Sequence, residues 1–296
     1  GAGGVDLAML VVAADEGFMP QTVEHLDILQ LLGVKDGLIV LTKTDLVDED
    51  WLNMLEEDVK SRVKGTFLED KPILRTSVRT GEGVEALREA LHDLTLHAEE
   101  KSARTPFRLP IDRVFSVDGF GTIVTGTLID GHIAVGDEAQ LMPLGNQCRV
   151  RNLQVHGRDV SAVYAGQRAA VNLAGIKKES ISRGDVLCRT DSMQPSLMLD
   201  VKLQNLPDSK RIIESGSRLH IYHGAAVRLA KAVLLDRDAL RPGESCYAQL
   251  RLSEALAARQ GDRFVARFYS PLETVGGGMI LDEHPYRHKR YDARVI

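Results

Sequence analysis

The sequence predicts an α/β segment followed by two all-β domains. Residues 1–100 contain three nearly continuous apolar runs separated by helical periodicity, which is typical of a parallel sheet with helices packed against it. From residue 106 onward, short runs that alternate apolar and polar residues are separated by glycine turns, as in small barrels or sandwiches. The charged stretch Glu99–Arg108 lies between the two patterns and predicts a domain boundary.

Three strands are expected in the α/β segment, at Asp6–Ala14, Gly37–Leu41 and Pro72–Ser77. Their apolar residues are consecutive rather than alternating, which predicts strands buried on both faces of the sheet. With a helix after each strand, the order is β-α-β-α-β-α, the doubly wound pattern. In such sheets, ligands bind beyond the carboxyl ends of the strands.

Three helices are expected between and after these strands. The first opens at Pro20 with Thr22 as its cap, and it ends at Gly33. Asp50 is expected to cap the second, whose apolar residues recur every fourth position. The apolar positions of the second are Trp51, Leu55, Val59 and Val63, and those of the third are Val84, Leu87, Leu91 and Leu94.

Polar residues follow the second and third strands directly. TKTD occupies residues 42–45 and TSV occupies residues 76–78. Because the carboxyl ends of neighbouring parallel strands meet at one edge of a sheet, both clusters are expected at the ligand-binding edge. TKTD by itself is better explained as an ordinary loop that ends in a helix-capping aspartate, so the prediction of a binding site depends on the two clusters together.

The two clusters resemble the guanine-recognition motifs of GTP-binding proteins, the first of which is usually written NKxD. This resemblance implies that Asp45 accepts both N–H donors of a guanine edge in a charge-assisted pair. Lys43 would lay its stem along the base, and backbone groups near Ser77 and Val78 would meet the purine oxygen. Thr42 stands where the family usually has asparagine, so it keeps a hydroxyl and loses the amide. The implied cofactor is GTP or GDP with Mg²⁺.

The phosphate-binding motifs of that family are not found in the sequence. Neither a GxxxxGK[ST] loop nor a DxPGH segment is present, and in the family both precede the region that this chain resembles. We therefore expect a partial P-loop GTPase-type G domain, a fragment without its N-terminal half and without catalytic residues. On this expectation the phosphate and Mg²⁺ ligands lie upstream of Gly1, and the chain alone does not hydrolyse GTP.

Residues 11–25, VVAADEGFMPQTVEH, resemble the segment after the second switch in translational GTPases of the elongation factor Tu class. That class has a G domain followed by two all-β barrels. The resemblance implies a G-domain part at residues 1–100, barrels at residues 101–192 and 193–284, and the start of a linker at residues 285–296. Strands of the second barrel are expected at Met198–Leu203, Ser217–Tyr222, Ala225–Leu235, Ser245–Leu252 and Arg263–Ser270.

Two segments of the second barrel resemble the selenocysteine-specific elongation factors of the SelB type. They are SPLETVGGGMILD at residues 270–282 and HIYHGAAV at residues 220–227. The glycines at 276–278 are expected to allow a close approach between strands.

Residues 111–127, IDRVFSVDGFGTIVTGT, predict two paired strands joined by a turn at Asp118-Gly119. Elongation factor Tu has an acidic pair in the first of these strands, beside its aminoacyl pocket. Here the pair is Asp112-Arg113, and Arg168 stands where that factor has a neutral amide. Both differences resemble the SelB type. From the residues alone, a solvated charge on an edge strand is the slightly better interpretation of Arg113.

The resemblance implies an aminoacyl pocket formed by Asp112, Arg113, Phe115, Thr125 and Arg168. A selenol is more acidic than a thiol or a hydroxyl, so selenocysteine is an anion near neutral pH and serine is neutral. Two guanidiniums would favour the anion and would be left unpaired by the neutral side chain. Asp112 is expected either to position Arg113 or to meet the aminoacyl amino group.

As a whole, the resemblance implies a translational GTPase that binds GTP and selenocysteinyl-tRNA and delivers the tRNA to the ribosome at recoded UGA codons. A winged-helix region beyond residue 296 would bind the messenger-RNA hairpin that marks the codon. We expect a cytoplasmic monomer with no membrane partner. Two alternatives are another elongation factor Tu-like carrier of aminoacyl or initiator tRNA, and a non-catalytic barrel scaffold that has lost the nucleotide site.

The composition is that of a globular protein, with 44% hydrophobic and 27% charged residues. Cys148, Cys188 and Cys246 are far apart without CxxC spacing, which predicts buried free thiols rather than a zinc site or disulfides. Residues 1–104 carry 11 Lys and Arg against 21 Asp and Glu, and the remainder carries 26 against 21. Any polyanionic partner is therefore expected at the β part of the chain, and ordinary surface charge is the alternative explanation for so small a positive excess.

Overall fold

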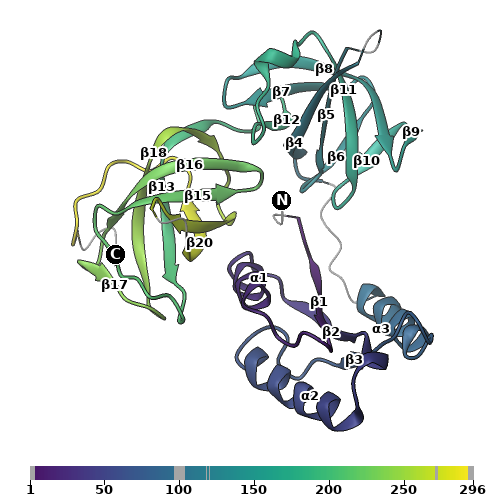
Figure 1. The fold of residues 1–296 in the computed structure, drawn as a ribbon. Helices are drawn as coiled ribbons and strands as arrows, with labels where there is room; N and C mark the ends of the chain where they lie inside the picture. The colour runs from purple at the N-terminus through teal and green to yellow at the C-terminus, as the bar shows by residue number, and fades with distance from the viewer. Residues whose placement is uncertain (1–3, 97–103, 118, 120, 271–272, 293–296) are drawn as a thin grey trace. The chain divides into compact units, whose positions relative to one another are not determined.

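The structure is a computed structural model that describes residues 4–96, 104–117, 119, 121–270 and 273–292. It contains two compact units, one covering residues 5–100 and the other covering residues 101–296 with residues 1–4. Figure 1 shows helices in the first unit and two groups of strands in the second. The boundary predicted at residues 100–101 lies outside the described residues.

A parallel sheet in the order β1-β2-β3 forms the centre of the first unit. Its strands are β1 (Leu7–Ala13), β2 (Asp36–Thr42) and β3 (Ile73–Arg75). The central strand β2 is buried from residue 37 to residue 41, as predicted. The prediction was wrong for β1, because Met9 and Val11 are 48% and 47% exposed. β1 is an edge strand of this sheet, and the apolar core covers only its other face.

Helices cover both faces of β2. They are α1 (Pro20–Leu31), α2 (Glu49–Val63) and α3 (Val84–Leu96), with a short 3-10 helix at Thr44–Leu46. Leucines of α1 and α2 pack with Ile39 and Leu41 in one core. Ala90 and Leu94 of α3 lie beside Leu38, on the opposite face of the strand, and Figure 1 shows α3 on the other side of the strands from α2. The doubly wound pattern is therefore present.

Two predicted helix caps were wrong. Thr22 lies inside α1, which begins at Pro20 after Met19 and has no side-chain cap; proline at this position needs no hydrogen-bond partner for its nitrogen. Asp50 lies in the first turn of α2, and Asp48 is the cap, because its carboxylate accepts a 2.8 Å hydrogen bond from the Trp51 backbone N–H.

The first barrel of the second unit is a closed six-stranded sheet. Its order is β11-β5-β4-β12-β7-β8, and pairing between β8 and β11 closes it. The strands are β4 (Arg108–Val117), β5 (Gly121–Thr127), β7 (Glu138–Met142), β8 (Asn146–Val155), β11 (Arg168–Ala174) and β12 (Val186–Arg189). Short strands β6 (His132–Ala134) and β10 (Ala162–Tyr164) pair with each other, β9 (Arg158–Val160) extends β8, and a 3-10 helix lies at Lys178–Ser180. Asp118 of the predicted turn lies outside the described residues.

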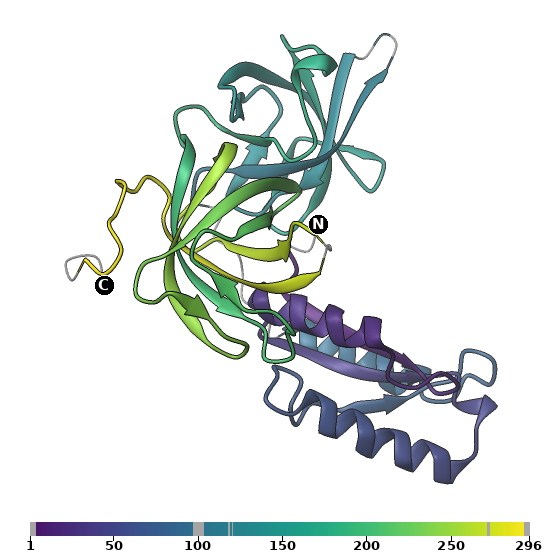
Figure 2. The same cartoon turned by 60° about the vertical axis from the view of Figure 1, so that its left-hand side comes forward.

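The second barrel is closed in the order β13-β18-β16-β15-β19-β20. Its strands are β13 (Pro195–Asn205), β15 (Arg218–His223), β16 (Ala226–Leu234), β18 (Ser245–Ala257), β19 (Arg263–Phe268) and β20 (Thr274–Asp282), with a small pair β14 (Ile213–Glu214) and β17 (Ala239–Leu240). Figure 2 shows these strands wrapping around one core. Phe264 is the largest side chain that is fully buried in it.

The glycine run at residues 276–278 forms part of β20, a strand that the sequence did not predict as such. A Cβ on Gly276 would lie 1.9 Å from the carbonyl oxygen of Gln204, and one on Gly278 would lie 1.9 Å from that of Lys202. Only glycine therefore allows β20 to approach β13 this closely, as the expectation of a close strand contact required.

Residues 284–291 follow β20 and lie against the outside of the second barrel. The Gln249 side chain donates to the Tyr286 carbonyl at 2.9 Å, and His288 lies 2.6 Å from the Asp200 carboxylate. The Arg290 side chain donates to the Leu234 carbonyl at 3.0 Å. The segment predicted as the start of a linker is thus attached to the barrel up to residue 291.

A buried group of charges joins the two barrels. Arg108 of the first barrel pairs with Asp130 beside it and donates two hydrogen bonds, of 2.6 and 2.7 Å, to Asp262 of the second barrel. His223 lies 2.9 Å from the same carboxylate. In the opposite direction, Arg259 of the second barrel reaches carbonyl oxygens of Pro106 and Ser192. These crossing contacts fix one barrel against the other.

Burial alone would raise the pKa of Asp262, but the hydrogen bonds from His223 and Arg108 lower it far below its usual range. The side chains of Arg108 and Asp262 are only 11% and 10% exposed. Buried charges of this kind are stable only when they are paired, so the contact depends on all of its members.

The three cysteines are free and buried, as predicted. Burial raises the pKa of Cys148 to about 11 and that of Cys246 to about 12, so these thiols are unreactive at neutral pH. None of the helices in the described part of the chain combines the length and apolar character needed to cross a membrane.

Candidate functional site

The two polar clusters of the first unit meet at the carboxyl ends of β2 and β3. β2 ends at Thr42 and β3 ends at Arg75, and the two strands are adjacent and parallel. Backbone hydrogen bonds continue past their ends, from the Thr76 N–H to the Leu41 carbonyl at 2.8 Å and from the Thr44 N–H to the Thr76 carbonyl at 3.3 Å. The sheet therefore brings residues 42–45 and 76–78 together, as the sequence predicted.

Asp45 and Ser77 are in direct contact. The Ser77 hydroxyl donates a 2.6 Å hydrogen bond to one carboxylate oxygen of Asp45, and it accepts one of 3.2 Å from the Thr80 N–H. Ser77 is fully buried, and the Asp45 side chain is 14% exposed. The serine thus orients the carboxylate and leaves acceptor positions on it for a ligand that presents N–H donors.

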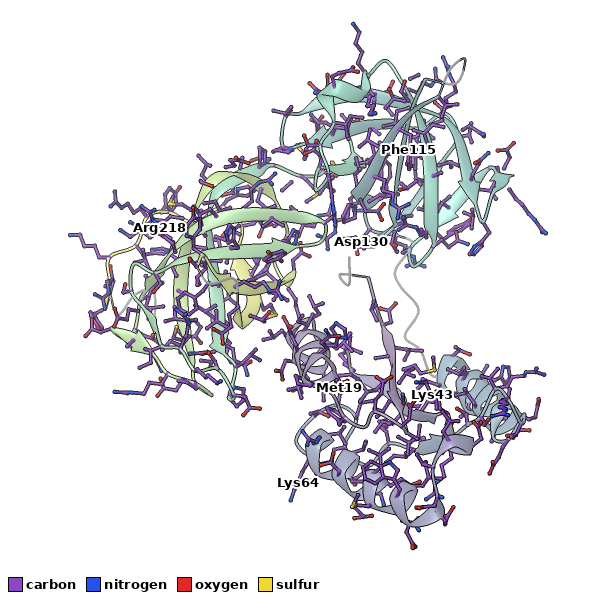
Figure 3. All side chains as sticks on the ribbon, in the orientation of Figure 1. Met19, Lys43, Lys64, Phe115, Asp130 and Arg218 are labelled. Atoms are coloured by element: carbon purple, nitrogen blue, oxygen red, sulfur yellow. The ribbon has the colours of Figure 1, made fainter. Side chains whose placement is uncertain are left out.

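Lys43 has an ammonium group held by a neighbouring loop. Its Nζ lies 2.9 and 3.0 Å from the carboxylate oxygens of Asp15 and 3.2 Å from one of Glu16, both in the turn after β1. Hydrogen bonds to these two acids, Asp15 first, raise the pKa of Lys43. Sequence reasoning missed both acids, because they lie 28 and 27 residues away along the chain and meet Lys43 only through the pairing of β1 with β2. Figure 3 labels Lys43 among the side chains.

The remaining two residues of the predicted guanine site differ in exposure. Thr42 is the last residue of β2, pairs with Ala13 and is half-buried. Val78 is 91% exposed in the turn after β3. This turn closes at Gly83, which lies so near the end of β3 that a Cβ there would be 1.8 Å from the Arg75 carbonyl oxygen; since φ is also +68°, only glycine fits.

The donor and acceptor groups of this edge suit a guanine base. A carboxylate that accepts only, already oriented by a serine, matches two adjacent N–H donors, and the Lys43 stem offers an apolar surface to a ring. No group of three or more His, Cys, Asp or Glu side chains that could hold a metal ion occurs in the parts of the chain that the structure describes.

A second group of predicted residues lies on the outer face of the first barrel, on β4, β5 and β11. The pairing of β4 with β5 shifts between Ile111 and Arg113, which is a β-bulge. Ile111 and Val114 both face the core, so the bulge places two consecutive residues, Asp112 and Arg113, between inward-facing positions. A bulge re-aims side chains in this way.

The neighbouring strands add three residues to this face. Thr125 of β5 pairs with Arg113 and with Ala170, and Arg168 of β11 pairs with Thr127. Val124 and Ala169 are buried in the core, so alternation along each strand places Thr125 and Arg168 outside. Phe115 is 42% exposed on β4 and is labelled in Figure 3. All five residues of the predicted aminoacyl pocket therefore share one face.

Asp112 connects two of these residues. Its carboxylate accepts hydrogen bonds of 2.5 and 3.0 Å from the two terminal nitrogens of Arg168, and one of 2.7 Å from the Thr125 hydroxyl. Although burial would raise the pKa of Asp112, these partners lower it. The structure thus shows Asp112 holding Arg168, an arrangement that neither sequence-based interpretation of Asp112 included.

Arg113 differs from Arg168 in having no such partner. It is exposed, and among the described residues no hydrogen bond or ion pair involves its side chain. The face therefore presents one cation that is neutralised by Asp112 and one that is open to an incoming anion.

Three protein families match consecutive parts of the chain. The elongation factor Tu GTP binding domain matches residues 1–97, and elongation factor Tu domain 2 matches residues 121–188. The selenocysteine-specific elongation factor, beta-barrel domain, matches residues 200–287.

Curated relatives named selenocysteine-specific elongation factor are similar to this chain over nearly its whole length. The selenocysteine-specific elongation factor of Desulfomicrobium baculatum is 44% identical over 282 residues, which are 95% of this chain and 44% of that protein. The one from Escherichia coli (strain K12) is 36% identical over 288 residues, which are 97% of this chain and 45% of that protein. The chain thus spans a little under half the length of these relatives.

Solved structures of proteins with the same names have folds similar to that of this chain. The apo form of translation elongation factor SelB from Methanococcus maripaludis has a TM-score of 0.86 at 28% identity, covering 96% of this chain and 66% of that chain. A bacterial selenocysteine-specific elongation factor EF-Sec has a TM-score of 0.83 at 29% identity, covering 95% of this chain and 45% of that chain.

Proposed function

Because the chain belongs to the family of selenocysteine-specific elongation factors, we propose that the protein is a translational GTPase that carries selenocysteinyl-tRNA to the ribosome. In this proposal the first unit reads the guanine of GTP or GDP, and the outer face of the first barrel receives the aminoacyl group. Its site of action is the cytoplasmic ribosome at recoded UGA codons. Recognition of a messenger-RNA hairpin is not assigned to residues of the two barrels.

The observation that carries the proposal is the open cation on the face of β4, β5 and β11. Arg113 has no partner among the described residues, while Arg168 is held in place by Asp112. An ionised selenolate would give Arg113 the counter-ion that it lacks, and the neutral hydroxyl of serine would not. Discrimination would then come from attraction of the anion and from the cost of leaving the guanidinium unpaired against serine.

The nucleotide part of the proposal depends on Asp45 and Ser77. Asp45 would accept the two N–H groups at the guanine edge, and Ser77 would keep the carboxylate in orientation. Lys43 would lie along the base, with Thr42 and Val78 at the border of the site. Hydrolysis of the bound GTP would then release the factor through a domain rearrangement, and no residue of this chain is assigned a step in hydrolysis.

Replacing Arg113 with alanine is expected to narrow the preference for selenocysteinyl-tRNA over seryl-tRNA by up to about tenfold. A charge-assisted hydrogen bond contributes about 1.5–3 kcal/mol, and the exposure of Arg113 places its effect at the lower end of that range. The measurement is the affinity of each aminoacylated tRNA for a chimera in which this chain replaces the matching segment of the Desulfomicrobium baculatum relative.

Arg158→Ala is the matched control, since Arg158 is an exposed arginine on β9 of the same barrel, and it is expected to leave the preference unchanged. Equal affinity of the unaltered chimera for both tRNAs would reject the selenocysteine assignment. An unchanged preference in the Arg113→Ala chimera would remove Arg113 from the pocket.

A further inference from the structure

Lys43 has an unusual backbone conformation for a side chain of its size. Its φ and ψ are 58° and 35°, in the left-handed region, which residues other than glycine, asparagine and aspartate seldom adopt. Such conformations persist where surrounding contacts impose them, and they occur often at binding sites. The left-handed backbone of Lys43 therefore suggests that surrounding contacts fix this residue. The contacts of the Lys43 side chain identify the groups that do so.

The contacts that hold Lys43 come from a turn that is itself fixed. The Ala14 N–H donates to the Thr42 carbonyl at 2.8 Å, which ties the turn to the end of β2. The Trp51 indole N–H of α2 donates to the Ala14 carbonyl at 2.8 Å from the other side. The turn closes with a 2.8 Å bond from the Gly17 N–H to the Ala13 carbonyl, at a glycine with φ of +73°.

Of the two acids in this turn, Asp15 is the better placed. Both of its oxygens lie within 3.0 Å of the Lys43 Nζ, and its side chain is 32% exposed. Glu16 makes a single 3.2 Å contact and is 60% exposed. A short aspartate side chain on a fixed turn also loses less conformational freedom than a glutamate in making the contact.

We propose that Asp15 is a positioning residue for nucleotide binding, which anchors the Lys43 ammonium so that the lysine stem forms one wall of the base pocket. The inference rests on the proposed guanine site and adds a residue to it. Asp15 would not touch the base. It would reduce the freedom that Lys43 loses when a base binds, which is the general benefit of preorganisation.

This role predicts an effect on affinity without an effect on selectivity. The apolar stem of Lys43 can lie against any purine, so loss of its anchor weakens guanine and adenine binding alike. Asp45 reads the edge of the base, and its loss changes the ratio between the two. The two kinds of residue are therefore separable by titrating one protein with two nucleotides.

The experiment titrates the 296-residue chain with GMP and with AMP, and follows binding by NMR, including the signals of the Lys43 side-chain methylenes. Asp15→Asn is expected to weaken binding of both nucleotides by about two- to fivefold, the effect of one exposed ion pair. The GMP-to-AMP ratio is expected to stay as in the unaltered chain. Asp15→Glu, which keeps the charge, is expected to recover most of the affinity.

Asp58→Asn is the matched control, because Asp58 pairs with Arg62 on α2 and is similarly exposed. It is expected to change neither affinity nor ratio, and thermal unfolding is expected to show the same midpoint for all variants. Unaltered GMP affinity in Asp15→Asn, in a chain that prefers GMP, would overturn the positioning role alone. No preference for GMP in the unaltered chain would overturn the guanine site itself, and the inference with it.

Discussion

Replacing Asp262 with alanine is expected to lower the free energy of unfolding of the two-barrel unit by about 3–5 kcal/mol, the usual effect of removing one partner from a buried ion pair. Arg108 would keep only Asp130 as a counter-ion, and His223 would lose its partner. Both side chains would remain buried at the contact between the barrels. The measurement is urea unfolding of the whole chain, followed by circular dichroism in the β region.

Acid provides a second readout of the same contact. Because the pKa of Asp262 is lowered in the folded state, its stabilisation is complete above the pKa of an unfolded aspartate, about 4. The stabilisation is lost as the pH falls from there through the lower pKa of the folded state. Asp262→Asn cannot titrate, so its unfolding free energy is expected to depend less on pH below about 4 than that of the unaltered chain.

Asp208 offers the control for both measurements, since it is an exposed aspartate of the same barrel. Asp208→Ala is expected to change the free energy of unfolding by less than about 0.5 kcal/mol, as surface substitutions usually do. A loss of similar size in Asp262→Ala would mean that the charges between the barrels are not a major source of stability.

Replacing Asp45 with alanine is expected to reduce GMP affinity by roughly ten- to hundredfold, which corresponds to the loss of a hydrogen bond to a charged group. AMP does not offer the same pair of N–H donors and is expected to bind the variant as it binds the unaltered chain. The GMP-to-AMP ratio therefore falls to about one. Ser77 would also lose the carboxylate that accepts the hydrogen bond from its hydroxyl, which is expected to change GMP affinity less than the loss of the Asp45 contacts with the base.

A companion variant tests the direction of the hydrogen bonds. Asp45→Asn replaces one acceptor with an N–H donor, which suits a base with a carbonyl in place of the guanine amino group. Xanthosine monophosphate has that carbonyl, and its affinity is expected to rise while GMP affinity falls. Asp50→Ala is the control, because Asp50 is an acid in the first turn of α2 without the cap role of Asp48. A GMP preference that survives both Asp45 variants would exclude Asp45 as the reader of the base.

Local sequence patterns predicted the change from an α/β segment to β domains and left barrel or sandwich open; the two barrels were implied by the family resemblance. The local patterns failed where the burial of a strand, or its presence, depends on contacts with a segment that is distant in the sequence. β1 was predicted to be buried on both faces from its apolar run, yet Met9 and Val11 are exposed, because the core of α1 and α2 residues covers only the face that carries Leu10 and Val12. The strand β20 was not predicted, because its glycines have a low strand propensity. Their presence is explained only by the close approach of β13, which leaves no room for a Cβ.

The candidate sites show the same limit. Residues 42–45 and 76–78 could be placed together because parallel strands end at one edge. Asp15 could not be added, since its contact with Lys43 depends on β1 lying beside β2. On the barrel, the role of Asp112 was open between two partners, and the bulge in β4 gave it a third, Arg168. The functional roles of these residues stay predictions until the variants above are measured.

The glycine strand β20 also has a consequence for how the second barrel forms during synthesis. β20 pairs with β13, the first strand of the barrel, and with β19. As a nascent chain emerges from its N-terminus, β13 and β19 keep open edges until residues 274–282 have left the ribosome. Open strand edges can pair with other chains. Asp262 of the Arg108–Asp262 contact belongs to the same barrel, whose last strand begins about twelve residues after Asp262 and is therefore synthesised after it. The nascent chain is therefore most prone to aggregate just before its least bulky strand closes the barrel.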